Sequence, residues 1–512
     1  MHKNKFLSLT VSFALAALAL GGTTPAIAAT KTVTIAVPGL PPSQGNPYRE
    51  GPGTPGIHTY TAIFDALTFV DLQGNVKPRL ALSWKNTSPT TWQFTLRKGV
   101  KFSNGEPFNA DSVVATIDYL ASTEGRTTNI GGTELPGVAS ARKISDLVVE
   151  ITTRETATQP SADAILPAKL SALYIVEPKA WREAGSKVIS QKAIGTGPFK
   201  VDSLTTTRIE LSAFKTSWRK PKSDKLVIIP LADSASRLQA LQSGQVNLVA
   251  SLDPEQINAV RQAGGTLSIP QAPQVMSLAF SVIKGGPVAD VRVRQALNYA
   301  VNKVSISNRL LNGRGAAATQ GATPLAQGHN KKVVGYPFNP GKAKQLLAAA
   351  GYANGLTLSA DITVGSFPAD NLIYQSVKSD LAKVGVTLNY RTITFAQWLP
   401  LYNAYTWTSD MLGLSWNTAP RGDAARPYEN FVCKPTGAFY CDAAQSALLK
   451  SAGVEFDSKK RKAILEDLAA KVTASAPALY LVQQIDLYGI GKGTTGFSAT
   501  NRAIAYENIT VK

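Results

Sequence analysis

The sequence predicts an α/β fold with mixed sheets, divided into at least two lobes. The chain has 512 residues, which is more than one ordinary hydrophobic core organises. Segments with the alternation of strands and segments with the periodicity of helices follow one another along the chain, a pattern typical of α/β domains. No short repeat appears, and no low-complexity linker marks a boundary between the lobes.

Residues 1–28 have the pattern of a secretory signal peptide. Lys3 and Lys5 precede an apolar run at 6–20, and small residues at 26–28 offer a cleavage site. The run is shorter than the roughly 20 apolar residues of a membrane span. No cysteine lies beside the cleavage site, so no lipid anchor is expected there.

Residues 92–114 predict a strand, a turn and a helix in succession. Apolar and polar side chains first alternate, with the period of a half-buried strand, and the apolar ones are Trp92, Phe94 and Leu96. A turn at Asn104-Gly105 follows, since both residues accept positive φ. Asn109 then offers a polar side chain suited to the start of a helix.

A second stretch predicts a strand at 226–231, a helix that Asp233 caps, and a strand at 246–249. Asp253-Pro254 then opens another helix, which Gly264 ends. This order is a βαβ arrangement, the building unit of α/β sheets.

The same alternation continues through the second half of the chain. A helix is expected at 291–303, where apolar residues recur at helical spacing: Val293, Ala296, Leu297, Ala300 and Val301. Further elements are expected as a helix from Asn339-Pro340 to Gly351, a strand at 356–363, a helix at 370–384 and a strand at 386–390.

Four strings of this chain resemble family 5 of the extracellular solute-binding proteins, the periplasmic binding proteins that serve dipeptide, oligopeptide and nickel-chelate ABC importers. They stand in the family's order at 92–114, 195–201 (GTGPFKV), 236–249 (SRLQALQSGQVNLV) and 291–303 (VRVRQALNYAVNK). The resemblance implies the two-lobed periplasmic binding protein fold, with a hinge between the lobes and an extra subdomain in the first lobe.

The expected organisation follows from this resemblance. After the signal peptide, lobe I covers 29–275 with an inserted subdomain at about 65–190. Lobe II covers 276–485, and residues 486–512 return to lobe I. Solute would bind between the lobes, which close over it.

The segment after residue 411 is the first candidate for ligand contact. Trp416 ends an apolar, strand-like run where the chain enters a loop, and the family carries a tryptophan at this place. Trp416 either contacts the ligand or fills the core. Peptide-binding members generally place an aspartate just after it for the ligand's ammonium, whereas this chain has no acid until Asp423. Asp423 either takes that role or holds its own loop. Arg421 and Arg426 either clamp a ligand carboxylate or lie on the surface.

Further candidates come from other segments. The Gly- and Pro-rich segment 51–60 is expected to be a loop that allows close approach of a solute. The family's loop at this place contributes to the cleft, which makes His58 and Tyr60 candidate contacts, and the alternative for His58 is a structural surface histidine. Trp407 belongs to an aromatic cluster that either lines the cleft or fills the core. Lys169 lies beside Ala168, the residue that matches an arginine of nickel-chelate binders.

Composition excludes several other functions. Cys433 and Cys441 are the only cysteines and are expected to form a disulfide in an oxidising compartment. So few cysteines and histidines do not make a metal site, and no cofactor is expected. The net charge of +19 comes from scattered residues, so nucleic acid is not an expected partner. No catalytic motif such as GxSxG or HExxH is present, so an enzyme, for example a secreted hydrolase, is not expected.

We therefore expect a monomeric periplasmic protein that captures a small solute and delivers it to an inner-membrane ABC permease. A short peptide is the first candidate cargo. The alternatives within the same fold are an opine, a sugar conjugate or a metal chelate.

Overall fold

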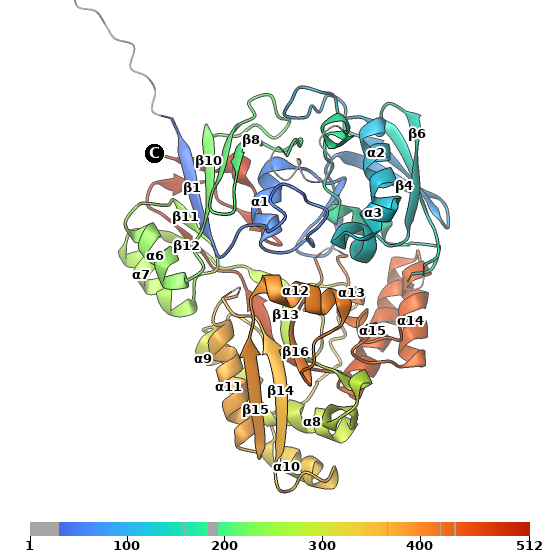
Figure 1. Cartoon of the computed structure of the whole chain (residues 1–512), viewed down its shortest axis with the longest axis vertical. Helices are drawn as coiled ribbons and strands as arrows, with labels where there is room; N and C mark the ends of the chain where they lie inside the picture. The colour runs from blue at the N-terminus through green and yellow to red at the C-terminus, as the bar shows by residue number, and fades with distance from the viewer. Residues whose placement is uncertain (1–29, 157–158, 183–192, 366, 420, 435–436) are drawn as a thin grey trace, which may run out of the picture. The chain divides into compact units, whose positions relative to one another are not determined.

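The computed structural model describes residues 30–156, 159–182, 193–365, 367–419, 421–434 and 437–512. The predicted signal peptide therefore lies outside the described residues. The remainder of the chain, from Lys31 to Lys512, is one compact unit that contains two large sheets. Each large sheet forms the centre of one lobe (Figure 1).

The sheet of the first lobe has seven strands in the order β12-β18-β11-β1-β10-β9-β8. Strand β1 (Thr32–Val37) is parallel to its two neighbours, whereas the outer strands are antiparallel. The other strands are β8 (Phe199–Leu204), β9 (Ile209–Ala213), β10 (Lys225–Pro230), β11 (Leu248–Val249), β12 (Thr266–Ser268) and β18 (Tyr488–Ile490). Helices α1 (Gly56–Ile63), α6 (Ser234–Gln242) and α7 (Ile257–Gln262) belong to this lobe. The sheet is therefore mixed, as the sequence predicts.

A smaller sheet lies in the first lobe between β1 and β8 in sequence. Its order is β4-β5-β7-β6, built from β4 (Ala81–Ser88), β5 (Thr91–Leu96), β6 (Val138–Ser145) and β7 (Val148–Thr153). Helix α2 (Ala110–Ala121) packs on β6, and the Asn109 side chain accepts a hydrogen bond from Ser112 N, so the predicted cap is confirmed. Short elements complete this region: β2 (Thr68–Val70), β3 (Val76–Pro78), α3 (Thr123–Arg126) and α4 (Leu166–Lys169).

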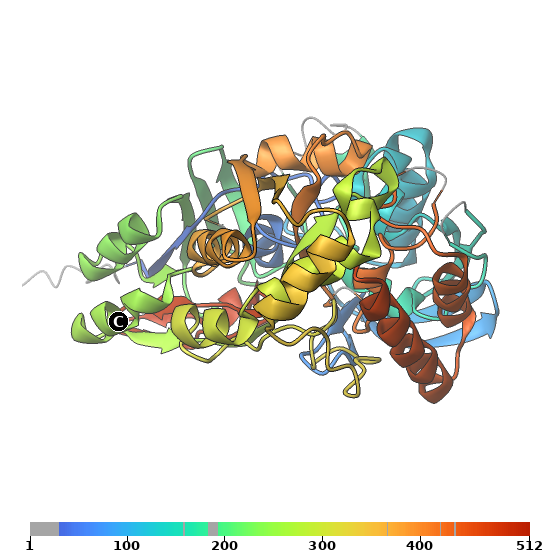
Figure 2. The same ribbon diagram turned by 90° about the horizontal axis from the view of Figure 1, so that it is seen from below.

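The sheet of the second lobe has the order β15-β14-β16-β13-β17. Its strands are β13 (Gln271–Phe280), β14 (Leu356–Ile362), β15 (Val386–Thr392), β16 (Met411–Asn417) and β17 (Ala478–Ile485). Helices of this lobe are α8 (Val291–Ala300), α9 (Lys303–Leu310), α10 (Pro340–Ala349), α11 (Asp370–Ala382), α12 (Phe395–Ala404), α13 (Ala425–Tyr428), α14 (Ala443–Val454) and α15 (Ser458–Ser475). Figure 2 shows α14 and α15 packed against each other.

The helix predicted at 291–303 buries the side chains that the spacing selects. Val293, Ala296, Leu297 and Ala300 are at most 1% exposed and belong to the core of the second lobe. Helical periodicity was a sufficient signal here because these side chains share the face of α8 that packs into the core, whereas Val291 and Arg292 are exposed.

The last residues return to the first lobe. Strand β18 lies between β11 and β12, and Arg219 pairs with Glu507 at 3.0 Å. Ser223 Oγ donates to the Ile509 carbonyl at 2.6 Å, and the Tyr506 hydroxyl donates to the His58 carbonyl at 2.6 Å. The C-terminal segment thus contributes a strand and several buried contacts to the first lobe.

Two local expectations differ from the structure. Residues 56–60, expected as part of a loop, form the first turns of α1, whose residues from His58 to Ile63 are buried. The strand expected at 246–249 pairs only at Leu248 and Val249. In the first case all the prolines and all the glycines except Gly56 lie before the helix, so the loop signal extends into residues that tertiary packing makes helical.

Two predicted features concern the chain's environment. Cys433 and Cys441 form the predicted disulfide, eight positions apart in the sequence. Within the described residues, no helix combines the length and the apolar character that crossing a membrane would require.

Candidate functional site

A cavity of about 650 Å³ lies where the two lobes meet. The first lobe contributes residues 50–54, 129–136 and 159–169 to its lining, and the second lobe contributes residues of α12, β16 and the segment 421–434. Its volume falls in the range of about 300–1,000 Å³ that is usual for small-molecule sites. It is therefore the candidate site of this protein.

One wall of the cavity is a row of aromatic side chains on α12. Phe395, Trp398 and Tyr402 are three and four residues apart, so they project from the same face of the helix. The Phe395 and Trp398 rings stack at 5.7 Å, and the Trp398 and Tyr402 rings stack at 4.8 Å. Trp398 Nε1 donates to the Gly413 carbonyl at 3.1 Å, which fixes the indole against β16. The row provides a flat apolar surface for a bound solute.

Trp416, the first predicted contact, lines the cavity at the end of β16. The side chain is only 5% exposed, and its ring lies 5.1 Å from Phe431, centroid to centroid. Its Nε1 donates to Ser277 Oγ at 2.7 Å, so the indole N–H already has a partner. What Trp416 offers a solute is therefore part of its ring.

Ionic contacts across the cavity join the two lobes. Arg426 Nη1 of the second lobe donates to Glu134 Oε2 of the first lobe at 2.5 Å, and Arg421 Nη2 lies 3.6 Å from the same oxygen. Arg421 also pairs with Glu429. Burial alone would raise the pKa of Glu134, but Arg426 and Arg421 lower it below its ordinary value. The two predicted arginines thus line the cavity already paired with carboxylates.

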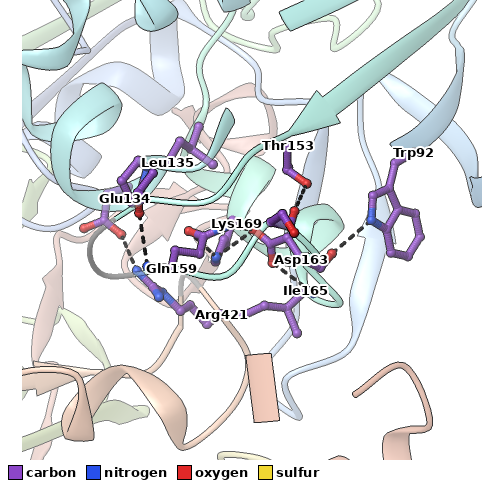
Figure 3. Close-up of polar contacts among 12 residues, drawn as sticks. Trp92, Glu134, Leu135, Thr153, Gln159, Asp163, Ile165, Lys169 and Arg421 are labelled. Atoms are coloured by element: carbon purple, nitrogen blue, oxygen red, sulfur yellow. Dashed lines mark hydrogen bonds and ion pairs between the residues drawn. The ribbon is translucent and has the colours of Figure 1, made fainter. Parts of the chain in front are cut away.

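A second buried group surrounds Lys169 in the first lobe. Lys169 Nζ donates to Asp163 Oδ2 at 2.7 Å and to Gln159 Oε1 at 3.0 Å (Figure 3). Burial lowers the pKa of Lys169, and the negative charge of Asp163 partly offsets that effect. Lys169 lines the same cavity as Arg421 and Glu134, which Figure 3 shows beside it.

Asp423 and Trp407 are not among the residues that line the cavity. Asp423 Oδ2 accepts from Arg461 Nε at 2.9 Å and from Arg461 Nη2 at 2.5 Å, and its Oδ1 accepts from Ala425 N. These contacts hold its own loop, the second of the two roles considered for this residue. Trp407 is 2% exposed, and its Nε1 donates to Ser281 Oγ at 2.7 Å.

His58 and Tyr60 lie on α1, away from the lining of the cavity. The Tyr60 hydroxyl lies 2.8 Å from Ser43 Oγ, and the residue is 1% exposed. His58 is 2% exposed, and its two ring nitrogens have no partner among the described residues. Burial, followed by the charges of Arg502 and Arg237, lowers the pKa of His58 to about 3.

We expect this imidazole to make the protein less stable in acid. The unfolded chain takes up a proton below pH 6.5, whereas the folded chain does so only near pH 3, so stability is lost as the pH falls between these values. The loss is at most about 1.4 kcal/mol per pH unit. Urea denaturation across this window should show a weaker pH dependence for His58→Gln than for the natural chain. Parallel curves for the two proteins would contradict this prediction.

Sequence reasoning missed several lining residues, among them Glu50, Asn129 and Glu134. Glu134 contacts Arg426, which lies 292 residues further along the chain, and no local sequence pattern predicts such a contact. The sequence alone does not show which polar side chains of the first half of the chain come together at the cavity.

The chain is similar to known proteins over most of its length. Residues 75–438 match the model of the bacterial extracellular solute-binding proteins, family 5. Heme-binding protein A of Haemophilus influenzae is 29% identical to this chain, and the match covers 76% of this chain and 74% of that protein. A dipeptide-binding protein of Pseudomonas aeruginosa is 26% identical, and the match covers 89% of this chain and 90% of that protein. A dipeptide-binding protein from Pseudoalteromonas sp. SM9913 in complex with Met-Leu has a TM-score of 0.83 at 19% identity, covering 94% of this chain and all of that one.

The match to the family model covers well over half of the chain, and the resemblance in fold extends over both lobes. The relatives are binding proteins. This chain belongs to the family 5 extracellular solute-binding proteins.

Proposed function

We propose that this protein captures a short peptide in the periplasm and delivers it, as a monomer, to an ABC permease of the inner membrane. The observation that carries the proposal is the cavity that both lobes line, with an aromatic wall and buried charges of both signs. A zwitterionic ligand needs partners for both of its charged ends, and its side chains need an apolar surface. Relatives named as dipeptide-binding proteins support this assignment.

Lobe closure is the proposed mechanism. A solute that touches residues of both lobes, such as Glu134 and Trp416, stabilises the state in which the lobes meet. In this mechanism the cargo leaves the protein chemically unchanged. Trp416 and Arg421 are the sequence-predicted residues that we propose as ligand contacts.

A metal chelate is the second candidate cargo. The stacked rings of Phe395, Trp398 and Tyr402 form a wall that also suits a flat conjugated ligand. A relative named as a heme-binding protein supports this alternative.

Thermal unfolding with a panel of ligands tests the proposal. Because a ligand that binds only the folded state raises the melting temperature, dipeptides and tripeptides are expected to do so. At about 100 times its Kd, a ligand stabilises the folded state by about 2.7 kcal/mol. Opines, haem and nickel-histidine complete the panel. A shift with haem and none with any peptide would replace the proposed cargo.

Trp398→Ala tests the aromatic wall. Truncating a half-buried indole of the cavity is expected to weaken peptide binding by about tenfold, which corresponds to about 1.4 kcal/mol. Isothermal titration measures the change. Trp84→Ala is the matched control, since Trp84 is also half-buried but does not line the cavity. Equal affinities of the two variants would contradict a role for the wall.

A further inference from the structure

One buried carboxylate in the cavity has no positive partner. Glu50 lines the cavity and is 6% exposed. Its Oε1 accepts from Ser43 N at 2.9 Å and from Ser43 Oγ at 2.5 Å. Its Oε2 is buried, and no donor among the described residues reaches it. An ionised carboxylate in this position lacks half of the contacts that normally stabilise it.

The other carboxylates of the cavity differ from Glu50 in this respect. Each lies within 3.8 Å of a lysine or arginine nitrogen, namely Glu134, Glu155, Asp163 and Glu429. Within the described part of the chain, no ion pair includes Glu50. Burial accordingly raises its pKa above the ordinary value, and the two hydrogen bonds from Ser43 only partly oppose this.

A second unpartnered acceptor lies on a segment that touches the one carrying Glu50. Asn129 Oδ1 is buried and has no hydrogen-bond donor among the described residues, and Asn129 also lines the cavity. The two segments touch, because Ile130 N donates to the Tyr48 carbonyl at 3.0 Å. Asn129 Oδ1 would lie only 3.1 Å from a Cβ atom at Gly51, the residue that follows Glu50. The absence of a side chain at Gly51 therefore leaves room for this oxygen against the backbone of the residue that follows Glu50.

The two oxygens define the chemistry of the missing partner. Both accept hydrogen bonds, and one belongs to a carboxyl group whose ionised form needs a positive partner, so a cation with several N–H donors suits the pair. A primary ammonium has three such donors. A calcium ion needs six to eight oxygen ligands, far more than these two. We propose that Glu50 and Asn129 bind a primary ammonium group of the captured solute, an inference that rests on the proposed peptide-binding function.

A peptide offers two sources of this group, its amino terminus and a lysine side chain. Three probes distinguish them by isothermal titration: Ala-Phe, N-acetyl-Ala-Phe, and N-acetyl-Ala-Lys. If the site binds the amino terminus, Glu50→Gln lowers the affinity for Ala-Phe at least about tenfold. If the site binds a lysine side chain, Glu50→Gln weakens N-acetyl-Ala-Lys to the same extent instead. In both cases N-acetyl-Ala-Phe, which has no ammonium, binds the variant and the natural protein equally.

Glu210→Gln is the control, since Glu210 pairs with Arg208 on the surface and does not line the cavity. It is expected to leave all three affinities unchanged. Asn129→Ala provides a second variant, with a loss of about threefold for the ammonium-bearing probe. Its melting temperature and that of Glu50→Gln verify that both variants fold.

Unchanged affinity of Glu50→Gln for both ammonium-bearing probes, together with binding of these probes by the natural protein, would overturn the inference and leave the proposed function intact. Absence of binding of every peptide by the natural protein would overturn both.

Discussion

Replacing Asp65 by asparagine is expected to lower the free energy of unfolding by about 3–5 kcal/mol, because the change removes the buried anion that faces both Arg79 and Arg219. Asp65 is 1% exposed. Its Oδ1 lies 2.9 Å from Arg79 Nε and 3.0 Å from Arg219 Nε. Its Oδ2 accepts from Thr196 Oγ1 and Trp218 Nε1, each at 2.9 Å. Although burial raises the pKa of Asp65, Arg219 and Arg79 lower it below its ordinary value, so the carboxylate is charged in the folded protein.

Urea denaturation at neutral pH measures this loss. Glu210→Gln is the control, because Glu210 pairs with Arg208 at 2.6 Å on the surface, where both side chains are about half exposed. Exposed pairs contribute about 0–1 kcal/mol, so the control should remain close to the natural protein. Equal stabilities of the two variants would show that Asp65 does not hold the first lobe together.

The second large effect is expected from Gly422→Ala, which should weaken peptide binding at least tenfold, or by about 1.4 kcal/mol, by keeping the lobes apart. Gly422 of the second lobe lies against Gly74 of the turn between β2 and β3 in the first lobe. A Cβ atom at Gly422 would lie 2.3 Å from the Gly74 carbonyl oxygen, which is far inside van der Waals contact. Since the obstructing atom belongs to the backbone, no side-chain rotation relieves the clash.

Isothermal titration measures the affinity, and small-angle X-ray scattering measures whether ligand still makes the variant more compact. Gly422 has φ +67°, so alanine there also carries the strain of a left-handed backbone. Gly105→Ala separates the two effects, because Gly105 has φ +93° and nothing within 4 Å of the added Cβ. Full ligand-induced compaction of Gly422→Ala would contradict the role of this contact in closure.

The elements of the fold were largely predictable because their signals are local. Asn109 and Asp233 accept hydrogen bonds as the caps of α2 and α6, and Trp92, Phe94 and Leu96 are buried on one face of β5. The two-lobed arrangement was predicted from the resemblance to a family, because the periodicity of the sequence does not show how the elements are arranged in space. The exact lobe boundaries remain predictions.

The site was less predictable because its contacts join distant segments. Trp416 and Arg421 line the cavity, whereas His58, Tyr60, Trp407 and Asp423 do not. For Asp423 the decisive residue is Arg461, 38 positions further along the chain. The ligand-binding roles of Trp416 and Arg421 are still predictions. Their contacts in the structure show which substitutions would test them.

The position of β18 has a consequence for how the chain is completed. Strand β18 lies between β11 and β12, so until residue 490 has been synthesised both of these strands have an open edge. Open edges invite pairing with other chains. The lobe that is synthesised first is therefore finished last, and a truncated chain that ends before β18 would aggregate rather than yield a separate first lobe.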